Sequence, residues 1–428
     1  AGTIRYSKEL GAWYLWNGVY FEEDKSDSVY AVIEEEITRA KKKIAETKTE
    51  KEFKRIYNGI SELMKARFQN NIIEQLRRKE GVRLDSIDQI NQDPYLLTLI
   101  NKTLNLRDGT VYEPRMEDMI TKKLNVSWDP HATCPRFDQF IHEIFDHNEE
   151  MIRYIQKLFG YCLRGGNEER IFVMLIGSSN NGKTTLLELM LDVFGIYGLS
   201  LHADTLKKTF GNQVPNDLFK LQGKRYLIVD EVGPQSIDGE KVKSMVGNNT
   251  ISARKMRSEW IEFRPQMVPF MATNFKPLFR ADDKAVWNRM IFIRMNVTFD
   301  KSEMVSNLRE SLLEEKNGIF QWLYRGYQLY EQEPEIIATE KNEYRDSVDI
   351  VHSFLSEVVH RSEHMEDGIT KKQLYAKYVE WCKFQCIRKV LTQAAFTRRV
   401  GESKDFVDGW VDGKRGWKGV VLDPEWMY

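Results

Sequence analysis

A glycine-rich segment at residues 177–185 carries the residue types that hold a phosphate chain. It reads Gly-Ser-Ser-Asn-Asn-Gly-Lys-Thr-Thr and fits the pattern G-x-x-x-x-G-K-[ST]. Glycines at both ends let the backbone curl so that successive N–H groups face one phosphate chain, and the helix that follows adds its positive end. Lys183 would bridge the terminal phosphates, and the Thr184 hydroxyl would hold Mg²⁺. The expected nucleotide contacts are Gly177, Ser178, Asn180, Asn181, Gly182, Lys183, Thr184 and Thr185.

The flanking sequence favours this interpretation over a chance turn of small residues. An apolar run at 171–176 precedes the segment, and an apolar helix over 186–193 is expected to follow it. A buried strand, a glycine-rich loop and a helix, in this order, form the context in which the pattern binds phosphate. A phosphate loop alone indicates only a nucleotide, so the reaction has to be inferred from other residues.

Two carboxylates follow a second apolar run, at 226–229. Asp230 is suited to hold Mg²⁺ through water, and Glu231 is suited to polarise the water that attacks the γ-phosphate. An acidic pair at the end of a strand is also common on protein surfaces. The phosphate-loop lysine 47 residues upstream favours the catalytic interpretation.

A third apolar run, at 270–273, ends at Asn274. A neutral amide there can hydrogen-bond both the γ-phosphate and the attacking water, whereas a carboxylate would repel the phosphate. Arg289 precedes a fourth run, at 291–293, and could stabilise transition-state charge on a nucleotide held by an adjacent subunit. An ordinary surface salt bridge is the alternative for Arg289, and Arg280 is a second candidate for the same role.

These four apolar runs alternate with helical stretches and show no polar alternation, which is typical of parallel strands buried on both faces. The predicted fold is therefore α/β, with a parallel sheet in a phosphate-loop core. The expected division is a helical N-terminal accessory or oligomerisation region at 1–150, the ATPase core at 151–300, a helical connection at 301–345, and a basic winged-helix-like domain at 346–428.

Composition limits the remaining classes of protein. The 428 residues are 42% hydrophobic, with 63 Lys and Arg against 64 Asp and Glu, so a disordered chain and a polybasic nucleic-acid coat are both excluded. Apolar stretches are far shorter than the roughly 20 residues that span a bilayer, and we expect no membrane association. Four cysteines are too few for a disulfide scaffold, so reduced thiols are expected.

At these motifs the sequence resembles the superfamily 3 helicases of DNA viruses and phages, a branch of the AAA+ ATPases. It is most similar to the helicase half of phage and large-DNA-virus primase-helicases, including the C-terminal part of a phage primase-polymerase. The resemblance covers about 90 to 300. The motifs that carry it are the phosphate loop at 177–184, Asp230-Glu231, the run at 241–255, Asn274 and Arg289.

This resemblance implies ATP and Mg²⁺ as cofactors, with ATP at the subunit interfaces of a hexameric ring. It also implies movement along one DNA strand in the 3′ to 5′ direction and a location in the cytoplasm of a virus- or phage-infected host cell. A fused or separate primase or polymerase is an expected partner. No Asp-x-Asp pair typical of polymerase metal sites occurs in the sequence, so synthesis is not part of the expectation.

Two basic segments are candidates for DNA contact. A strand-turn-strand between 246 and 265 would carry Arg254, Lys255 and Arg257 near its tip, and by resemblance it is the hairpin that tracks DNA. An exposed basic turn without function is the alternative. Residues 371–418 hold twelve Lys and Arg against five Asp and Glu, a net charge of +7, and include Arg398 and Arg399 on an expected helix. A protein-contact domain with merely solvated lysines is the alternative there.

The function favoured by these residues is an ATP-dependent replicative DNA helicase. A small-molecule kinase with a phosphate loop leaves Asn274, the basic hairpin and the basic terminus without roles. An ATP-binding DNA-associated assembly platform, which recruits an origin or primase without unwinding, has the same nucleotide site and remains the main alternative.

Overall fold

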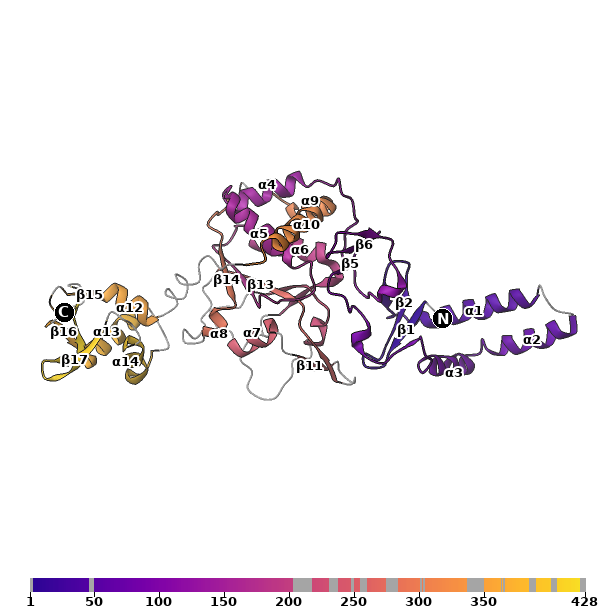
Figure 1. The fold of residues 1–428 in the computed structure, drawn as a ribbon, viewed down its shortest axis with the longest axis horizontal. Coiled ribbons are helices and arrows are strands. Elements are labelled where there is room, and N and C mark those ends of the chain that lie inside the picture. The colour runs from indigo at the N-terminus through magenta and orange to yellow at the C-terminus, as the bar shows by residue number, and fades with distance from the viewer. Residues whose placement is uncertain are drawn as a thin grey trace. The chain divides into compact units, whose positions relative to one another are not determined.

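The computed structural model divides the chain into two units (Figure 1). The first comprises residues 1–277 and 289–339, and the second comprises 278–288 and 340–428. The structure describes residues 3–45, 50–202, 218–230, 238–247, 250–254, 260–274, 284–300, 302, 305–336, 350–362, 364, 366–384, 390–401 and 406–423. Within these ranges no helix is long and apolar enough to cross a membrane. The cysteines that lie in them, Cys134, Cys162 and Cys382, are buried free thiols.

A five-stranded sheet forms the centre of the first unit. Its strands lie in the order β14-β8-β13-β10-β9, and all neighbouring pairs are parallel. The bounds are β8 (Phe172–Ile176), β9 (Gly198–Leu201), β10 (Tyr226–Val229), β13 (Val268–Thr273) and β14 (Met290–Arg294). The predicted α/β fold with a parallel sheet is confirmed.

Helices cover the sheet on both faces. Phe159 of α5 (Glu149–Tyr161) stacks on Phe270 of β13, with ring centroids 4.8 Å apart. Phe194 of α6 (Lys183–Phe194) stacks on Tyr226 of β10 at 5.0 Å. Figure 1 shows α5 and α6 on one side of the sheet and α7 (Gly239–Val246) on the other. Burial on both faces explains why the strands lack polar alternation.

The helices on either side of the predicted core belong to the same hydrophobic core as the sheet. These are α4 (Pro135–Ile144), α9 (Leu308–Glu314) and α10 (Lys316–Gln332). Phe137 and Trp322 pack edge to face at 5.2 Å, and both are buried with strand residues of the sheet. The predicted division at 150 and 300 therefore does not match the limits of this core. In the sequence, charged residues alternate with the apolar residues of these helices, so the buried side of each helix was not evident.

Helices α5 and α10 approach so closely that glycine is required at their contact. A Cβ at Gly326 would lie 2.0 Å from the Gln156 carbonyl oxygen, and a Cβ at Gly160 would lie 2.1 Å from the Tyr327 nitrogen. Backbones can approach this closely only where no side chain intervenes. Helix α10 is therefore an integral part of the core and not the connection that was predicted at 301–345.

The N-terminal region is not purely helical, which corrects the prediction for 1–150. It combines α1 (Ser28–Ala45), α2 (Glu50–Glu62) and α3 (Ala66–Leu76) with short strands. Four strands pair in the order β3-β2-β1-β4, and three more pair as β5-β6-β7. Their bounds are β1 (Ile4–Ser7), β2 (Ala12–Trp16), β3 (Phe21–Glu23), β4 (Arg83–Leu84), β5 (Leu96–Thr98), β6 (Thr103–Asn105) and β7 (Val111–Tyr112). Strands of two to five residues are too short to show a period of two in the sequence.

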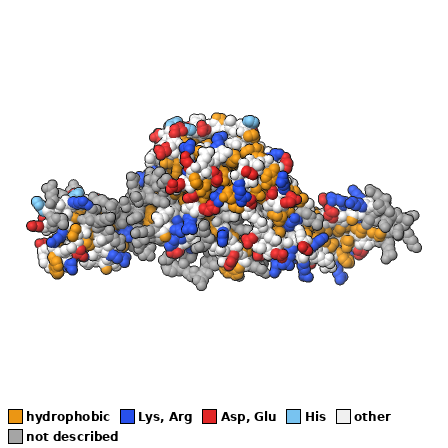
Figure 2. Space-filling model, in the orientation of Figure 1, with side chains coloured by type: hydrophobic (Ala, Val, Ile, Leu, Met, Phe, Trp, Pro, Cys, Tyr) orange, Lys and Arg blue, Asp and Glu red, His pale blue; other side chains and the backbone are white. Residues whose placement is uncertain are grey.

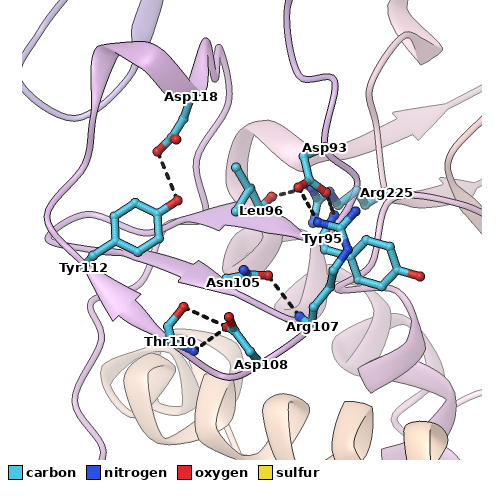
Figure 3. Close-up of polar contacts among 10 residues, drawn as sticks. All are labelled: Asp93, Tyr95, Leu96, Asn105, Arg107, Asp108, Thr110, Tyr112, Asp118 and Arg225. Carbon is cyan, nitrogen blue, oxygen red and sulfur yellow. Dashed lines mark hydrogen bonds and ion pairs between the residues drawn. The ribbon is translucent and has the colours of Figure 1, made fainter.

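A buried arginine ties β10 to the segment before the core. Arg225 donates a hydrogen bond to the carbonyl oxygen of Leu96 at 2.7 Å (Figure 3). It donates another to the carbonyl oxygen of Leu163. Nearby, Asp93 accepts from Arg107 at 2.5 Å and from the Tyr95 N–H at 2.9 Å. Burial lowers the pKa of Arg225, yet its carbonyl partners satisfy the guanidinium. This cluster joins the start of β10 to β5.

Lys122 lies in the same basic neighbourhood. Gly223, in the left-handed region at φ 63°, leaves room for it, since a Cβ there would lie 2.9 Å from Lys122 Nζ. Burial, together with the nearby charges of Lys224 and Arg225, lowers the pKa of Lys122 to about 7. The protonated amine is therefore unfavourable in the folded protein.

The second unit has a hydrophobic core of its own. Its strands form a three-stranded sheet in the order β16-β18-β17 and a separate pair, β15-β19. The helices are α8 (Lys284–Trp287), α12 (Ile350–Val358), α13 (Lys371–Phe384) and α14 (Gln393–Gly401). The strands are β15 (Val359–Arg361), β16 (Gly368–Thr370), β17 (Val407–Val411), β18 (Lys414–Lys418) and β19 (Val420–Leu422). The helix that was expected to carry Arg398 and Arg399 is present as α14.

We predict that Gly326→Ala destabilises the protein. Alanine normally favours an exposed helix over glycine by about 1 kcal/mol, but here the new methyl group would force α5 and α10 apart, at a cost of about 1–3 kcal/mol. The melting temperature measures the effect. Gly59→Ala is the matched control, because nothing lies within 4 Å of its added Cβ in α2, and it should stabilise slightly. Equal effects from both variants would contradict the close contact.

We predict that Lys122→Met stabilises the protein most below pH 7. Between about pH 7 and the ordinary pKa of 10.5, the unfolded chain binds a proton that the folded chain does not, so wild-type stability rises with pH. The advantage of the variant should therefore shrink as pH rises from 7 to 9. Chemical denaturation across this range measures it. Lys123→Met is the control, since Lys123 packs over the Tyr20 ring instead, and a pH-independent advantage for Lys122→Met would refute the basic cluster as its cause.

Candidate nucleotide site

The predicted phosphate loop connects the end of β8 to the start of α6. Its backbone needs glycine at both ends, as the pattern predicted. A Cβ at Gly177 would lie 2.3 Å from the Met295 carbonyl oxygen, and Gly182 has φ 83° with Ile144 packed against it. The loop is thus held between the end of β14 and helix α4.

Lys183 points back into the loop. It is 5% exposed, and its Nζ donates to the carbonyl oxygens of Gly177, at 2.9 Å, and Ser178, at 2.6 Å. A third bond, at 2.8 Å, goes to Oδ1 of Asn181, which is 2% exposed and whose Nδ2 donates to the Met295 carbonyl oxygen at 3.3 Å. Asn181 therefore links the lysine side chain to the residue that follows β14. Ser178, Asn180 and Thr184 are exposed.

Asp230 and Asn274 lie at the same edge of the sheet as the loop. Both directly follow parallel strands, β10 and β13, at their carboxyl ends. Asp230 accepts a hydrogen bond from the Ser200 hydroxyl at 3.1 Å, and Asn274 Nδ2 donates to Ser179 Oγ of the loop at 3.4 Å. Glu231, the predicted water-polarising residue, lies outside the described residues.

A cleft of about 1050 Å³ brings these residues together. Its lining includes the loop from Ser179 to Thr185 together with Asp230 and Asn274. Sequence analysis missed its apolar wall, which is formed by Phe140, Leu187, Leu191, Phe299, Val305 and Leu308. The cleft therefore combines a polar floor at the strand ends with an apolar wall from helices α4, α6 and α9 and the segment before α9.

Arg309 is a further lining residue that sequence analysis missed. It bridges α9 to α6 through ion pairs of 2.7 Å with Glu188 and with Asp192. The acidic pair lies four residues apart on α6, but its partner lies more than a hundred residues away in the chain. No local pattern could therefore have identified it.

Arg289 lies at the amino-terminal ends of the strands, whereas the phosphate loop, Asp230 and Asn274 lie at their carboxyl ends. It directly precedes β14, and its carbonyl oxygen accepts from the Phe172 N–H at 2.7 Å, where β8 begins. A strand of five residues is about 17 Å long, so Arg289 lies about one strand length from Gly177. The structure does not bring Arg289 together with Lys183 and Asp230 within one chain. Arg280, the second candidate, lies outside the described residues.

The candidate DNA-contact residues belong to both units. Strands β11 (Ile251–Arg254) and β12 (Trp260–Phe263) form the antiparallel pair that was expected, with Arg254 at its end. Lys255 and Arg257 lie outside the described residues. In the second unit Arg398 is exposed and Arg399 is half-buried on α14. The space-filling view shows Lys and Arg side chains dispersed among acidic ones on the face drawn (Figure 2).

Two family models match separate parts of the chain. Residues 1–146 match the family described as D5 N terminal like, and residues 175–289 match a family of unknown function, DUF5906. The second match begins within β8 and ends at Arg289, so it includes the phosphate loop, Asp230 and Asn274.

Relatives occur in large DNA viruses. A protein named as a helicase, L207/L206 of Acanthamoeba polyphaga mimivirus, is 26% identical over 79% of this chain and 38% of its own length. A protein named as a primase, C962R of African swine fever virus, is 23% identical over 50% of this chain and 25% of its own length. The chain is similar to a module of these viral proteins named as helicases and primases. The module spans less than two fifths of either relative.

The fold of the module is shared with a solved structure. The apo structure of the NrS-1 C terminal region (305-718) matches with a TM-score of 0.52, at 11% identity, over 98% of the module and 95% of that chain. At this identity the likeness concerns the fold alone, and it agrees with the mixed α/β arrangement described above.

We predict that Asn181→Ala lowers the affinity of the module for ATP about tenfold. The substitution removes an acceptor from the Lys183 ammonium, and a hydrogen bond to a charged group contributes about 1.5–3 kcal/mol. Fluorescence titration with a labelled ATP analogue measures the affinity. Thermal melting of the variant checks that the fold persists, and unchanged affinity in a folded variant would remove the bracing role.

Proposed function

We propose that the module is an ATP-dependent replicative DNA helicase. The observation that carries the proposal is the meeting of the phosphate loop, Asp230 and Asn274 at one edge of the parallel sheet, within one cleft. Ligand sites in open parallel sheets lie at the carboxyl ends of the strands. The viral relatives are named as a helicase and a primase, which supports DNA replication as the process that uses this nucleotide site.

The residues present are suited to ATP with Mg²⁺. The Thr184 hydroxyl and the Asp230 carboxylate are both exposed to the cleft and would hold the ion, which would neutralise charge on the phosphates. In the described part of the chain no cluster of three metal-ligating side chains occurs. This agrees with Mg²⁺, which takes one or two protein ligands and completes its shell with phosphates and water.

The chain's own residues divide the work of hydrolysis in this proposal. Lys183, at the mouth of the loop, would exchange its carbonyl partners for phosphate oxygens. Asn274 would orient the attacking water beside the γ-phosphate, and Glu231 would polarise it. The apolar wall of the cleft offers a surface on which the base can pack.

Arg289 would act on the nucleotide of a neighbouring subunit. Its position at the far edge of the sheet separates it from the phosphate loop of its own chain. An arginine supplied from outside stabilises transition-state charge and raises hydrolysis about 10³-fold or more. We therefore propose a ring with ATP at subunit interfaces, and the expected number of subunits is six.

Two basic elements would hold DNA. The β11–β12 pair supports the expected tracking hairpin, in which Arg254, Lys255 and Arg257 contact phosphates in the channel of the ring. The second unit orders its elements as a winged helix does, with α14 and the β17–β18 pair following α13. Arg398 and Arg399 would contact DNA near the fork. A primase or polymerase, fused or separate, is the proposed partner.

Fork unwinding by the intact module tests the proposal. Wild-type protein should separate strands with ATP, and DNA should stimulate its ATP hydrolysis. Glu231→Gln should bind ATP without hydrolysing it, because the water is no longer polarised, and Lys183→Ala should lose ATP binding. Lys65→Ala, at the residue that precedes α3, is the control lysine variant.

The alternatives give different results in the same assays. DNA binding and ATP binding by wild-type protein without strand separation would favour an assembly platform. ATP hydrolysis that does not respond to DNA would favour a small-molecule kinase. Unaltered ATP affinity in Lys183→Ala would refute the assignment of the phosphate loop itself.

A further inference from the structure

One β-hairpin of the second unit carries two tryptophans with opposite surroundings. Trp417, on β18, is 3% exposed and belongs to the core of the unit, with Lys371 Nζ 4.5 Å from its ring centroid. Trp410, on β17, is 63% exposed, the highest value among the large hydrophobic residues described. Burial in the core accounts for Trp417, whereas Trp410 lies outside that core.

Trp410 is oriented without being covered. It lies opposite Arg415 in the register of β17 and β18, and the Arg415 guanidinium lies 5.4 Å from the indole centroid. A cation beside an aromatic face is attracted by the ring quadrupole, which limits the rotamers of both side chains. Among the described residues, strand β17 is also the edge of its sheet and pairs with β18 alone. The indole is therefore exposed on a strand that lies at the edge of the described sheet.

Two cations and one carboxylate lie on this face of the hairpin, where Asp408 pairs with Lys371 at 2.8 Å and with Arg415 at 3.6 Å. Trp410 and Asp408 point to the same face of β17, because side chains two apart share a face, and Asp408 lies opposite Trp417. The end of α14 abuts Trp417, since a Cβ at Gly401 would lie 3.2 Å from its ring. Arg398, one turn earlier on α14, is exposed on the same side of that helix.

We propose that Trp410 is a stacking site for an unpaired base of DNA, with Arg415 and Arg398 as contacts for the flanking phosphates. This inference rests on the proposed function, since it assumes that DNA is a ligand. The net charge of +7 over 371–418 favours a polyanion over a neutral protein partner.

An unpaired base fits better than a duplex. Bases within a duplex are already covered on both faces by their neighbours, so an indole finds a free base face only on a single strand or at the junction of a fork. Base-aromatic stacking is also tolerant of sequence, because every base has a π-face. A site of this kind would let the second unit hold a separated strand beside the fork.

DNA binding by the full chain tests the site. Fluorescence anisotropy would compare a labelled single strand, a fork and a blunt duplex. Trp410→Ala should weaken binding to the single strand and fork about tenfold and leave the blunt duplex unchanged. Trp410→Phe should restore most of the loss. Val407→Ala is the matched control, since Val407 is a neighbouring apolar residue on β17 that is 48% exposed, and it should bind as wild type does.

A crosslink locates the contact directly. Ultraviolet irradiation of a single strand that carries 5-bromouracil should attach it to the peptide containing Trp410, and the same base placed inside a duplex should not attach there. Mass spectrometry identifies the peptide, and Trp417 is the internal comparison on the same hairpin.

Specific results would overturn the site. Wild-type affinity in Trp410→Ala, an equal loss on single strand and blunt duplex, or a crosslink elsewhere would each refute base stacking at Trp410. Loss of binding to a partner protein with DNA binding intact would assign the edge strand to protein docking instead. If wild-type module binds no DNA at all, the proposed function fails as well, so the two failures are distinguishable.

Discussion

The candidate site depends on the parallel alignment of β8, β13 and β10. Because these strands run in one direction, the segments that follow them emerge at a single edge, and the phosphate loop, Asn274 and Asp230 meet there. Neighbouring strands lie about 4.8 Å apart, so side chains on adjacent strand ends come within reach of one ligand. An antiparallel partner in place of β13 would deliver Asn274 to the opposite edge.

Close backbone packing transmits this arrangement to the helices. Gly177 lies against the carbonyl of Met295, and Gly182 lies against Ile144 of α4, so the loop is shaped by β14 and by a helix upstream of the core. Helix α10 in turn packs onto α5 through Gly160 and Gly326. The nucleotide cleft and the flanking helices therefore form one packed body, in which movement of a helix would displace the phosphate loop.

Charge is distributed unevenly between the parts of the chain. The whole chain has a net charge of −1, whereas residues 371–418 carry +7. In the first unit the cations near the site are paired or buried, as Arg309 is with two carboxylates and Lys183 is within the loop. In the second unit Arg398 and Arg415 lie at the surface, and Arg415 is paired with Asp408 at 3.6 Å. The positive charge is therefore local to residues 371–418, and it suits the proposed contact with a polyanion.

Local chemistry in the sequence determined the phosphate loop, the continuous apolar strands and the basic terminal segment, because each depends on residues next to one another. Only the tertiary structure decided which strands are neighbours: it inserted β13 between β8 and β10, added the weakly apolar β9 at the sheet edge, and put Arg289 at the far edge. It also assigned α10 to the core and revealed Trp410 as exposed. Strand order and burial result from packing the whole chain, so short-range spacing carries little information about them.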